Sequence, residues 1–151
     1  MTGAGRRVGR AIAVAFARAG HDLVLTWRGD EAGALETVRL ASEAARGAGL
    51  PLPVVRALPL DLTDLSAVDP FARALEDGPL DVLVHNASRY ESRVFGAIDA
   101  EHAEAQFRIH AIAPLLLTQA LAPRLKESSL PAGGAAVMLG DMHAAGRPYQ
   151  R

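Results

Sequence analysis

The sequence predicts an α/β fold in which helices cover both faces of a doubly wound parallel sheet, and three observations support it. Short apolar runs of strand length alternate with longer segments whose apolar residues recur at helical spacing. The connections are short, and no linker, low-complexity tract or internal repeat interrupts the 151 residues. Alanine is abundant, and only 5% of the residues are aromatic, which is typical of helices packed closely on a sheet. We therefore expect a single partial domain over residues 1–151.

The first elements are expected to be a helix, a strand and a second helix. From Val8 to residue 19 the apolar residues follow helical spacing, and Gly20 supplies a stop. Residues 23–27 predict a short buried strand. A second helix is expected over residues 30–46, with Asp30 as its N-cap and Gly47 near its end.

The remaining elements continue the alternation. Strands are expected at residues 54–58, 80–84 and 135–139, and helices at residues 64–77 and 101–126. The first turn of the helix at 64–77 is expected to be broken before Pro70. Pro114 should kink the long helix, because proline removes one intrahelical donor.

Composition and charge exclude several classes of protein. The formal net charge is −1 and the basic residues are scattered, so no nucleic-acid partner is expected. The chain has no cysteine, which favours the cytoplasm, and no metal site is expected. No apolar run approaches the ~20 residues that cross a bilayer. Arg6 and Arg7 resemble a twin-arginine export signal, but Arg10 and Arg18 interrupt the apolar region that such a signal needs.

A glycine-rich segment leads directly into the first predicted helix. Its glycines permit a tight turn and a close approach of the backbone to a pyrophosphate, and the helix N-terminus adds a favourable dipole. Such glycines also occur in plain turns, and no Lys-Ser/Thr pair follows to make a P-loop. The candidate cofactor-binding residues here are Thr2, Gly3, Arg6, Arg7, Val8 and Gly9.

A turn of this kind is normally preceded by a strand, but here Thr2 follows Met1 directly. We therefore expect the first strand to be missing and the edges of its neighbours to be unpaired. We interpret Met1 as a wrongly assigned start, because a valine codon that can also initiate would turn a Val-Thr-Gly turn into Met-Thr-Gly.

The end of the strand at 23–27 favours NADP over NAD. Arg28 stands there, and no acidic residue follows until Asp30. A 2′-phosphate on the adenosine ribose requires positive charge at this position, whereas a bare ribose requires a carboxylate. The alternative interpretation of Arg28 is an ordinary solvated loop arginine.

Four short motifs fall in order along nearly the whole chain: Thr2-Gly3 with Gly9, Asp61-Leu62, Asn86-Ala87-Ser88, and the Ala-x-Ala-Pro stretch at 111–114. As an ordered set they resemble the short-chain dehydrogenase/reductase family. The resemblance implies a Rossmann-like sheet that binds NADP. It also implies that Asp61 contacts the adenine amino group, that Leu62 contacts the ring through its backbone, and that Asn86 and Ala87 support the cofactor and the central sheet.

Finer features resemble the pteridine reductase branch, including dihydromonapterin-reductase-like members. Thr2, Gly3, Arg7 and Gly9 match its Thr-Gly-x-x-x-Arg-x-Gly turn, whereas the general family usually has glycine where Arg7 stands. The run at 85–88 is also similar to that branch. This resemblance implies that Arg7 and Ser88 meet the cofactor phosphates or a pterin. It further implies that Tyr90 stacks on the pterin ring, since an aromatic face favours a flat heterocycle.

Two residues are catalytic candidates by the same resemblance. Asp141 follows the strand at 135–139, where most of the family has serine and the pteridine branch has aspartate; a carboxylate there could help deliver a proton to a pterin nitrogen. A helix cap or loop acid is the alternative for Asp141. His110 replaces the family's asparagine and could still hydrogen-bond a carbonyl or a water. A buried structural histidine is equally compatible.

The Tyr-x-x-x-Lys pair that carries the family's chemistry is expected roughly a dozen residues beyond Asp141, past Arg151. Tyr149 comes too early and is interpreted as a loop residue at the substrate mouth. We therefore expect the C-terminal strands and helices to be missing and this chain alone to be inactive. The full-length form is expected to be a homo-oligomeric, NADPH-dependent reductase of a dihydropterin-like small molecule. The alternatives are a general carbonyl or 3-oxoacyl reductase, a non-catalytic dinucleotide-binding protein, and an unfolded gene fragment.

Overall fold

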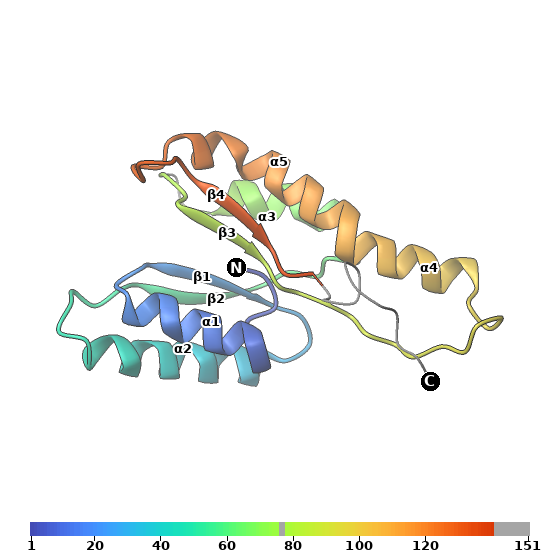
Figure 1. Ribbon diagram of the computed structural model, residues 1–151, viewed down its shortest axis with the longest axis horizontal. Helices are drawn as coiled ribbons and strands as arrows, with labels where there is room; N and C mark the ends of the chain where they lie inside the picture. The colour runs from blue at the N-terminus through green and yellow to red at the C-terminus, as the bar shows by residue number, and fades with distance from the viewer. Residues whose placement is uncertain (76–77, 141–151) are drawn as a thin grey trace.

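The computed structural model describes residues 1–75 and 78–140 and contains two parallel two-stranded sheets. Strand β1 (Leu23–Trp27) pairs with β2 (Val55–Pro59), and β3 (Val82–His85) pairs with β4 (Ala135–Met138). Figure 1 shows the two sheets side by side, with helices on opposite sides of them and the N-terminus between β1 and β3. This is the predicted Rossmann-like α/β arrangement with parallel strands.

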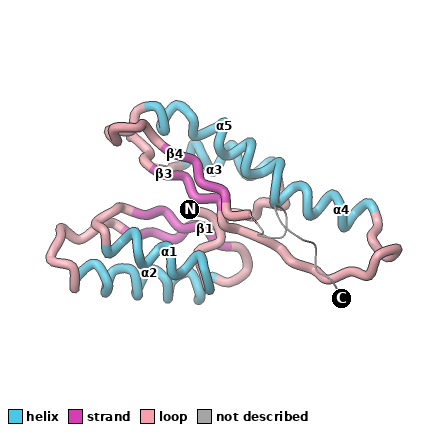
Figure 2. Tube along the Cα trace, viewed as in Figure 1, coloured by secondary structure: helices cyan, strands magenta, loops and turns pink. Residues whose placement is uncertain are grey.

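Helices α1 (Arg7–Arg18) and α2 (Glu31–Arg46) cover one face of the first sheet (Figures 1 and 2). The two helices approach each other closely because the residues between them are small. Ala13, Ala17 and Ala41 are completely buried. Asp30 caps α2 as predicted, since its carboxylate accepts a hydrogen bond from the backbone N–H of Gly33 at 2.9 Å.

The second sheet is covered by α3 (Val68–Ala74), which follows a short 3₁₀ turn (Leu65–Ala67), and by α5 (Ala113–Lys126). The 3₁₀ turn confirms the predicted break before Pro70. The core of this half consists mainly of larger side chains from β3, α3, α5, the segment after β2 and the turn before α5: Leu60, Leu62, Val68, Leu83, Ile109, Leu117, Leu121 and Leu125.

The long helix expected over residues 101–126 is present as a continuous helical run, but it is not uniformly α-helical. Helix α4 (Ala100–Phe107) is followed by a π-helical turn (Arg108–Ile112), and α5 begins at Ala113 with Pro114 in its first turn. A proline ring clashes with the carbonyl one turn earlier, and a widened turn before Pro114 removes that clash. The irregularity therefore lies before the proline rather than at it.

Residues Met1 and Thr2 link the two sheets where a further strand was expected to be missing. The Met1 carbonyl accepts a hydrogen bond from Thr26 N–H at 3.0 Å, and Thr2 N–H donates to the Val84 carbonyl at 2.9 Å. These two residues reach only one end of the facing strand edges. None of the helices in the described ranges combines the length and the apolar character that a bilayer crossing requires.

Candidate functional site at the carboxyl ends of the strands

A cleft of about 690 Å³ lies at the carboxyl ends of β1, β2 and β3, beside the N-terminus of α1. This end of a parallel sheet is where α/β proteins bind ligands, because loops diverge there and leave a crevice. Tyr90 lines the cleft, as do the predicted cofactor-binding residues other than Thr2: Gly3, Arg6, Arg7, Val8, Gly9, Arg28, Asp61, Leu62, Asn86, Ala87 and Ser88.

Thr2 lies beneath the cleft rather than in its lining, and it joins the glycine-rich turn to the end of β3. Its side chain is buried, and the hydroxyl oxygen accepts hydrogen bonds from the backbone N–H groups of Asn86 and Ala87, each at 3.1 Å. In return, the Asn86 amide donates to the carbonyls of Gly3 at 2.8 Å and Thr2 at 3.2 Å. Thr2 and Asn86 therefore hold the turn in place.

At two positions, Gly3 in the glycine-rich turn and Gly9 in the first turn of α1, there is no room for a side chain. Gly3 has a positive φ of 66°, and a Cβ atom there would lie 2.6 Å from the Ala87 Cα atom. At Gly9 a Cβ atom would collide with the Gly3 carbonyl and with the Asn86 amide. Glycine at both positions lets α1, the turn and the end of β3 approach closely enough to form one wall of the cleft.

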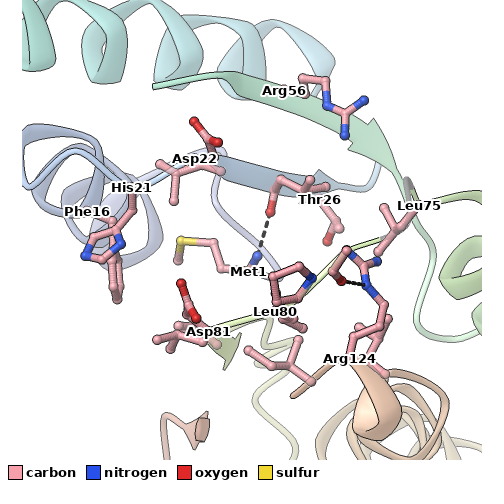
Figure 3. A pocket seen from close by; sticks show the side chains of 18 of the residues that line it. Met1, Phe16, His21, Asp22, Thr26, Arg56, Leu75, Leu80, Asp81 and Arg124 are labelled. Carbon is pink, nitrogen blue, oxygen red and sulfur yellow. Dashed lines mark hydrogen bonds between the residues drawn. The ribbon is translucent and has the colours of Figure 1, made fainter. Parts of the chain in front are cut away.

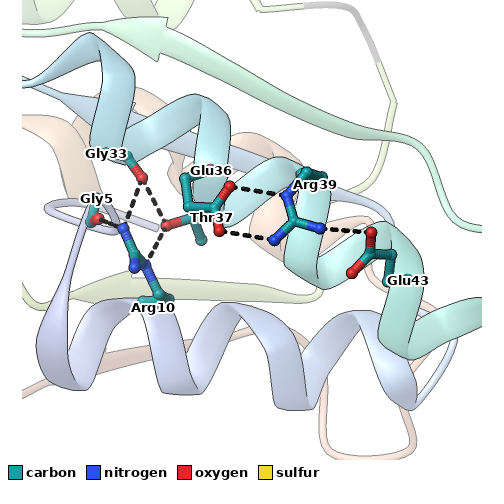
Figure 4. Close-up of polar contacts among 7 residues, drawn as sticks. All are labelled: Gly5, Arg10, Gly33, Glu36, Thr37, Arg39 and Glu43. Carbon is teal, nitrogen blue, oxygen red and sulfur yellow. Dashed lines mark hydrogen bonds and ion pairs between the residues drawn. The ribbon is translucent and has the colours of Figure 1, made fainter.

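Arg10 and Thr37 fix the turn from behind (Figure 4). The Arg10 guanidinium donates to the carbonyls of Gly5 at 2.6 Å and Gly33 at 3.1 Å, and to the Thr37 hydroxyl at 3.0 Å. The Thr37 oxygen also lies 2.9 Å from the Ala4 carbonyl oxygen. With their carbonyls held on this side, Ala4 and Gly5 are fixed against α2. Sequence reasoning missed both residues; an arginine inside the apolar periodicity of α1 was the available signal.

The start of α1 favours an anion. The first N–H groups of a helix have no intrahelical partner and carry a partial positive charge. Here Arg6 occupies the N-cap without a side-chain hydrogen bond, and the first turn contains no acidic residue. Arg6 and Arg7 are exposed and line the cleft. Arg7 adopts a φ of 48°, a left-handed conformation that favours glycine.

Arg28 and Asp61 meet at the second wall of the cleft. The guanidinium lies 3.6 Å from the Asp61 carboxylate, and both side chains are about half exposed. Burial acts to raise the pKa of Asp61. Hydrogen bonds from the Thr63 hydroxyl at 2.7 Å and the Thr63 N–H at 2.8 Å, together with the Arg28 charge, outweigh it and lower that pKa. Asp61 is therefore ionised, and Arg28 is half accessible to a ligand in the cleft.

Ser88 and His110 form a polar pair on the far side of the cleft. His110 Nδ1 lies 3.0 Å from the Gln106 carbonyl, which can only accept, so Nδ1 carries the proton in the neutral ring. His110 Nε2, 3.1 Å from the Ser88 hydroxyl, is then an acceptor for the Ser88 proton. The alternative of a buried structural histidine was wrong, because His110 is exposed.

Of three further residues interpreted in the sequence, the structure describes only Tyr90. The Tyr90 side chain is 83% exposed on the rim of the cleft, so one face of its ring is available to a ligand. Asp141 and Tyr149 lie outside the described residues.

A glycine-rich turn at a helix N-terminus, set at the carboxyl ends of parallel strands, defines a Rossmann-like α/β protein. The profile of the short chain dehydrogenase family matches residues 1–143, and the chain belongs to this family. The four ordered motifs identified in the sequence therefore indicate the correct family.

Curated relatives agree with this assignment. A short chain dehydrogenase of Monascus purpureus is 37% identical over 128 residues, which are 83% of this chain and 43% of the relative. Galactitol 2-dehydrogenase of Agrobacterium fabrum is 29% identical over 123 residues, which are 80% of this chain and 44% of the relative. The chain thus spans less than half the length of these relatives.

Solved structures give the same result. A short-chain dehydrogenase from Sphingobium yanoikuyae in complex with NADPH is 33% identical, with a TM-score of 0.76, over 94% of this chain and 52% of that one. A short chain dehydrogenase from Burkholderia cenocepacia in complex with NADP is 26% identical, with a TM-score of 0.82, over 98% of this chain and 56% of that one. Several structural neighbours are therefore complexes with NADP or NADPH.

Proposed function

We propose that the cleft binds NADPH and that the full-length protein is an NADPH-dependent oxidoreductase. The observation that carries the proposal is Arg28, which places a half-exposed guanidinium in the cleft at the end of β1, where a 2′-phosphate would require it. Complexes of similar proteins with NADPH and NADP support the same cofactor.

The other residues of the cleft fit the rest of the dinucleotide. The N-terminus of α1, with Arg6, Arg7 and the backbone of Val8, would hold the pyrophosphate. Asp61 and Leu62 would contact the adenine. The cleft wall formed by residues 86–88 would support the ribose and nicotinamide. When bound, NADPH supplies the hydride, and the protein's part is to position it against the substrate.

Cofactor binding by this chain tests the proposal, with fluorescence or calorimetric titration as the measurement. We expect NADPH to bind roughly 10-fold or more tightly than NADH, because only NADPH has the phosphate that forms a charge-assisted contact with Arg28. Arg28→Ala should weaken NADPH binding by about 10-fold and leave NADH binding unchanged. The matched control is Arg39→Ala, since Arg39 pairs with Glu36 and Glu43 on the exposed side of α2. Equal affinity for both cofactors would overturn the proposal.

For the substrate of the full-length protein we infer a dihydropterin-like heterocycle. Arg7, Ser88 and the exposed ring of Tyr90 all line the cleft, and a flat heterocycle could stack on that ring. Ser88 and His110 could orient its polar edge, and Asp141 is the proposed proton donor. A simple carbonyl compound is the second candidate, and the relative named galactitol 2-dehydrogenase, which interconverts an alcohol and a carbonyl, supports it.

A substrate panel on the full-length protein separates the two candidates. Dihydrobiopterin and dihydromonapterin are compared with simple ketones and 3-oxoacyl thioesters at saturating NADPH. Tyr90→Ala should raise KM for the pterin about 10-fold if stacking contributes, and Tyr90→Phe should leave KM unchanged. Turnover of carbonyl substrates alone would reject the pterin and retain the cofactor. Residues 1–151 alone are expected to show no turnover.

A further inference from the structure

The chain passes two open spaces as it runs through β3. Toward the amino end of β3, a cavity of about 600 Å³ lies between β1 and β3, where a further strand of the sheet was expected (Figure 3). At the carboxyl end lies the cleft of the candidate site, and the loop over residues 86–99 leads from it to α4 (Figure 1). Ser88, Arg89 and Tyr90 of this loop line the cleft, so the contacts that hold the loop also shape the cleft.

Glu91 connects this loop to α4 through both of its carboxylate oxygens. Oε1 accepts two hydrogen bonds from the Arg89 guanidinium, one from Nε at 2.6 Å and one from Nη2. Oε2 lies 3.4 Å from His102 Nδ1, in the first turn of α4. Since a carboxylate can only accept, the ring nitrogen that faces it carries a proton. Arg89, Glu91 and His102 thus form a bridge from the wall of the cleft to α4.

The bridge is partly sheltered from solvent, and its helical end is fixed. The His102 side chain is only 11% exposed, and those of Arg89 and Glu91 are about one-third exposed. The Asp99 carboxylate caps α4 by accepting a hydrogen bond from the His102 N–H at 2.7 Å. The hydrogen bonds from Arg89, with the charges of Arg89, His102 and Arg93, outweigh the effect of burial and lower the pKa of Glu91. Glu91 is therefore ionised at neutral pH.

Glu91 is also the last residue that is held before a long exposed stretch of the loop. Residues 92–99 are exposed throughout. On the other side of Glu91, among the residues that the structure describes, the nearest side chain bonded to a helix is Ser88, whose hydroxyl lies 3.1 Å from His110 Nε2. Without the bridge, the stretch that is not bonded to the helices would begin immediately after Ser88 and would include Tyr90.

We propose that Glu91 is a positioning residue that holds Tyr90 at the rim of the cleft and thereby places its ring against the substrate. The pairing of Arg89 with Glu91, two residues apart, puts both side chains on one side of the chain. The Tyr90 side chain between them is left on the other side, where it is 83% exposed. The contact with substrate rests on the proposed function, whereas the placement of Tyr90 by the bridge requires neither cofactor nor substrate.

Trypsin cleavage of the 151-residue chain tests the placement. Trypsin cuts after Arg89 in the bridge and after Arg93 in the exposed stretch, so each digest contains its own reference. In His102→Ala the rate after Arg89, relative to that after Arg93, should rise roughly 3- to 5-fold, because loss of a partly buried ion pair lets the segment open more often.

Two further variants complete this test. His102→Asn should restore the wild-type ratio of the two cleavage rates, since its amide nitrogen takes the place of Nδ1. Glu101→Ala is the matched control, because Glu101 is an exposed residue in the same turn of α4, and the ratio should not change. An unchanged ratio in a His102→Ala chain that circular dichroism shows to be folded would mean that the bridge does not hold the loop, and the proposal would fail.

Steady-state kinetics of the full-length protein test the contact with substrate. Glu91→Gln should raise KM for the substrate about 5-fold and change kcat less, because it loosens Tyr90 without altering the reacting groups. Glu91→Gln combined with Tyr90→Ala should raise KM no further than Tyr90→Ala alone, since Glu91 acts through Tyr90. Additive increases in KM would refute that role. Absence of turnover by the wild-type protein would instead reject the proposed function, and the trypsin ratio would still decide whether the bridge places Tyr90.

Discussion

The two halves of the molecule pack different side chains. In the half built on β1 and β2, the residues buried between helices and sheet are mainly alanines, and Ala13, Ala17 and Ala41 are completely inaccessible. In the half built on β3 and β4, larger residues fill the core, with Val68 and Leu117 each 1% exposed. Close helix contact holds the first half together, whereas the second half depends on filled volume. Each half should therefore be sensitive to a different change.

The largest effect is expected from a cavity in the second half. Leu117→Ala should lower the free energy of unfolding by roughly 2–5 kcal/mol, because it removes buried methyl groups and leaves a void between α5 and the sheet. Urea denaturation measures it. Leu115→Ala on the same helix is the control, since Leu115 is 65% exposed, and its effect should stay within about 0.5 kcal/mol. Similar losses in both variants would show that this core is not tightly packed.

The next effect concerns the junction between the halves and applies to the 151-residue chain as it stands, in which burial lowers the pKa of the Met1 ammonium from 8.0 to about 6. The unfolded chain then binds a proton more readily than the folded chain. The contribution of the neutral Met1 amine to the free energy of unfolding is fully present above pH 8. It decreases by on the order of 2 kcal/mol as the pH falls from 8 to 6. Burial and the Met1 charge also lower the pKa of His85, which extends the loss below pH 6.5.

Denaturation curves at pH 8, 7 and 6 measure this dependence. Acetylation of the Met1 amine is the control, because it removes the Met1 titration and leaves only burial to lower the pKa of His85. The acetylated chain should lose much less stability between pH 8 and 6. A loss of the same size in both forms would assign the effect to another group.

The first half was the more accurately predicted of the two. Residues 23–27 form β1 as expected, and Asp30 caps α2, because a short apolar run and a capping residue are local properties of the sequence. In the second half, the π-helical turn at 108–112 and the exposure of His110 depend on how α4 and α5 meet other elements. Local patterns contain no information on that packing.

At the candidate site, the residues that line the cleft could be predicted from the sequence. The contacts that hold those residues in place could not. Strand ends and a glycine-rich turn converge in any sheet of this topology, so Arg28, Asp61 and Asn86 could be assigned to one cleft from their positions alone. Arg10 and Thr37, whose contacts support the turn, are 27 residues apart in the sequence and lie on two different helices. No spacing rule pairs them.

Substitutions of Arg10 test whether its contacts behind the glycine-rich turn contribute to cofactor binding. Arg10→Met should weaken NADPH binding about 10-fold, because the Gly5 carbonyl loses its donor and the turn is no longer held against α2. Arg10→Lys should fall between the two, since lysine can reach one carbonyl but not all three partners. Cofactor titration measures both variants, and circular dichroism verifies that they are folded. Unchanged affinity in a folded Arg10→Met chain would limit Arg10 to a structural role.

The smallest effect is expected at Arg7, where stability and binding should change in opposite directions. Arg7→Gly should raise the free energy of unfolding by about 1 kcal/mol, because glycine adopts the left-handed φ of 48° without strain. The same change should weaken NADPH binding a few-fold, since it removes a charge beside the N-terminus of α1. Arg6→Gly is the control: the N-cap is already extended at a φ of −159°, so only binding should decrease. Greater stability in both variants would show that removal of positive charge, rather than relief of strain, stabilises this end of the helix.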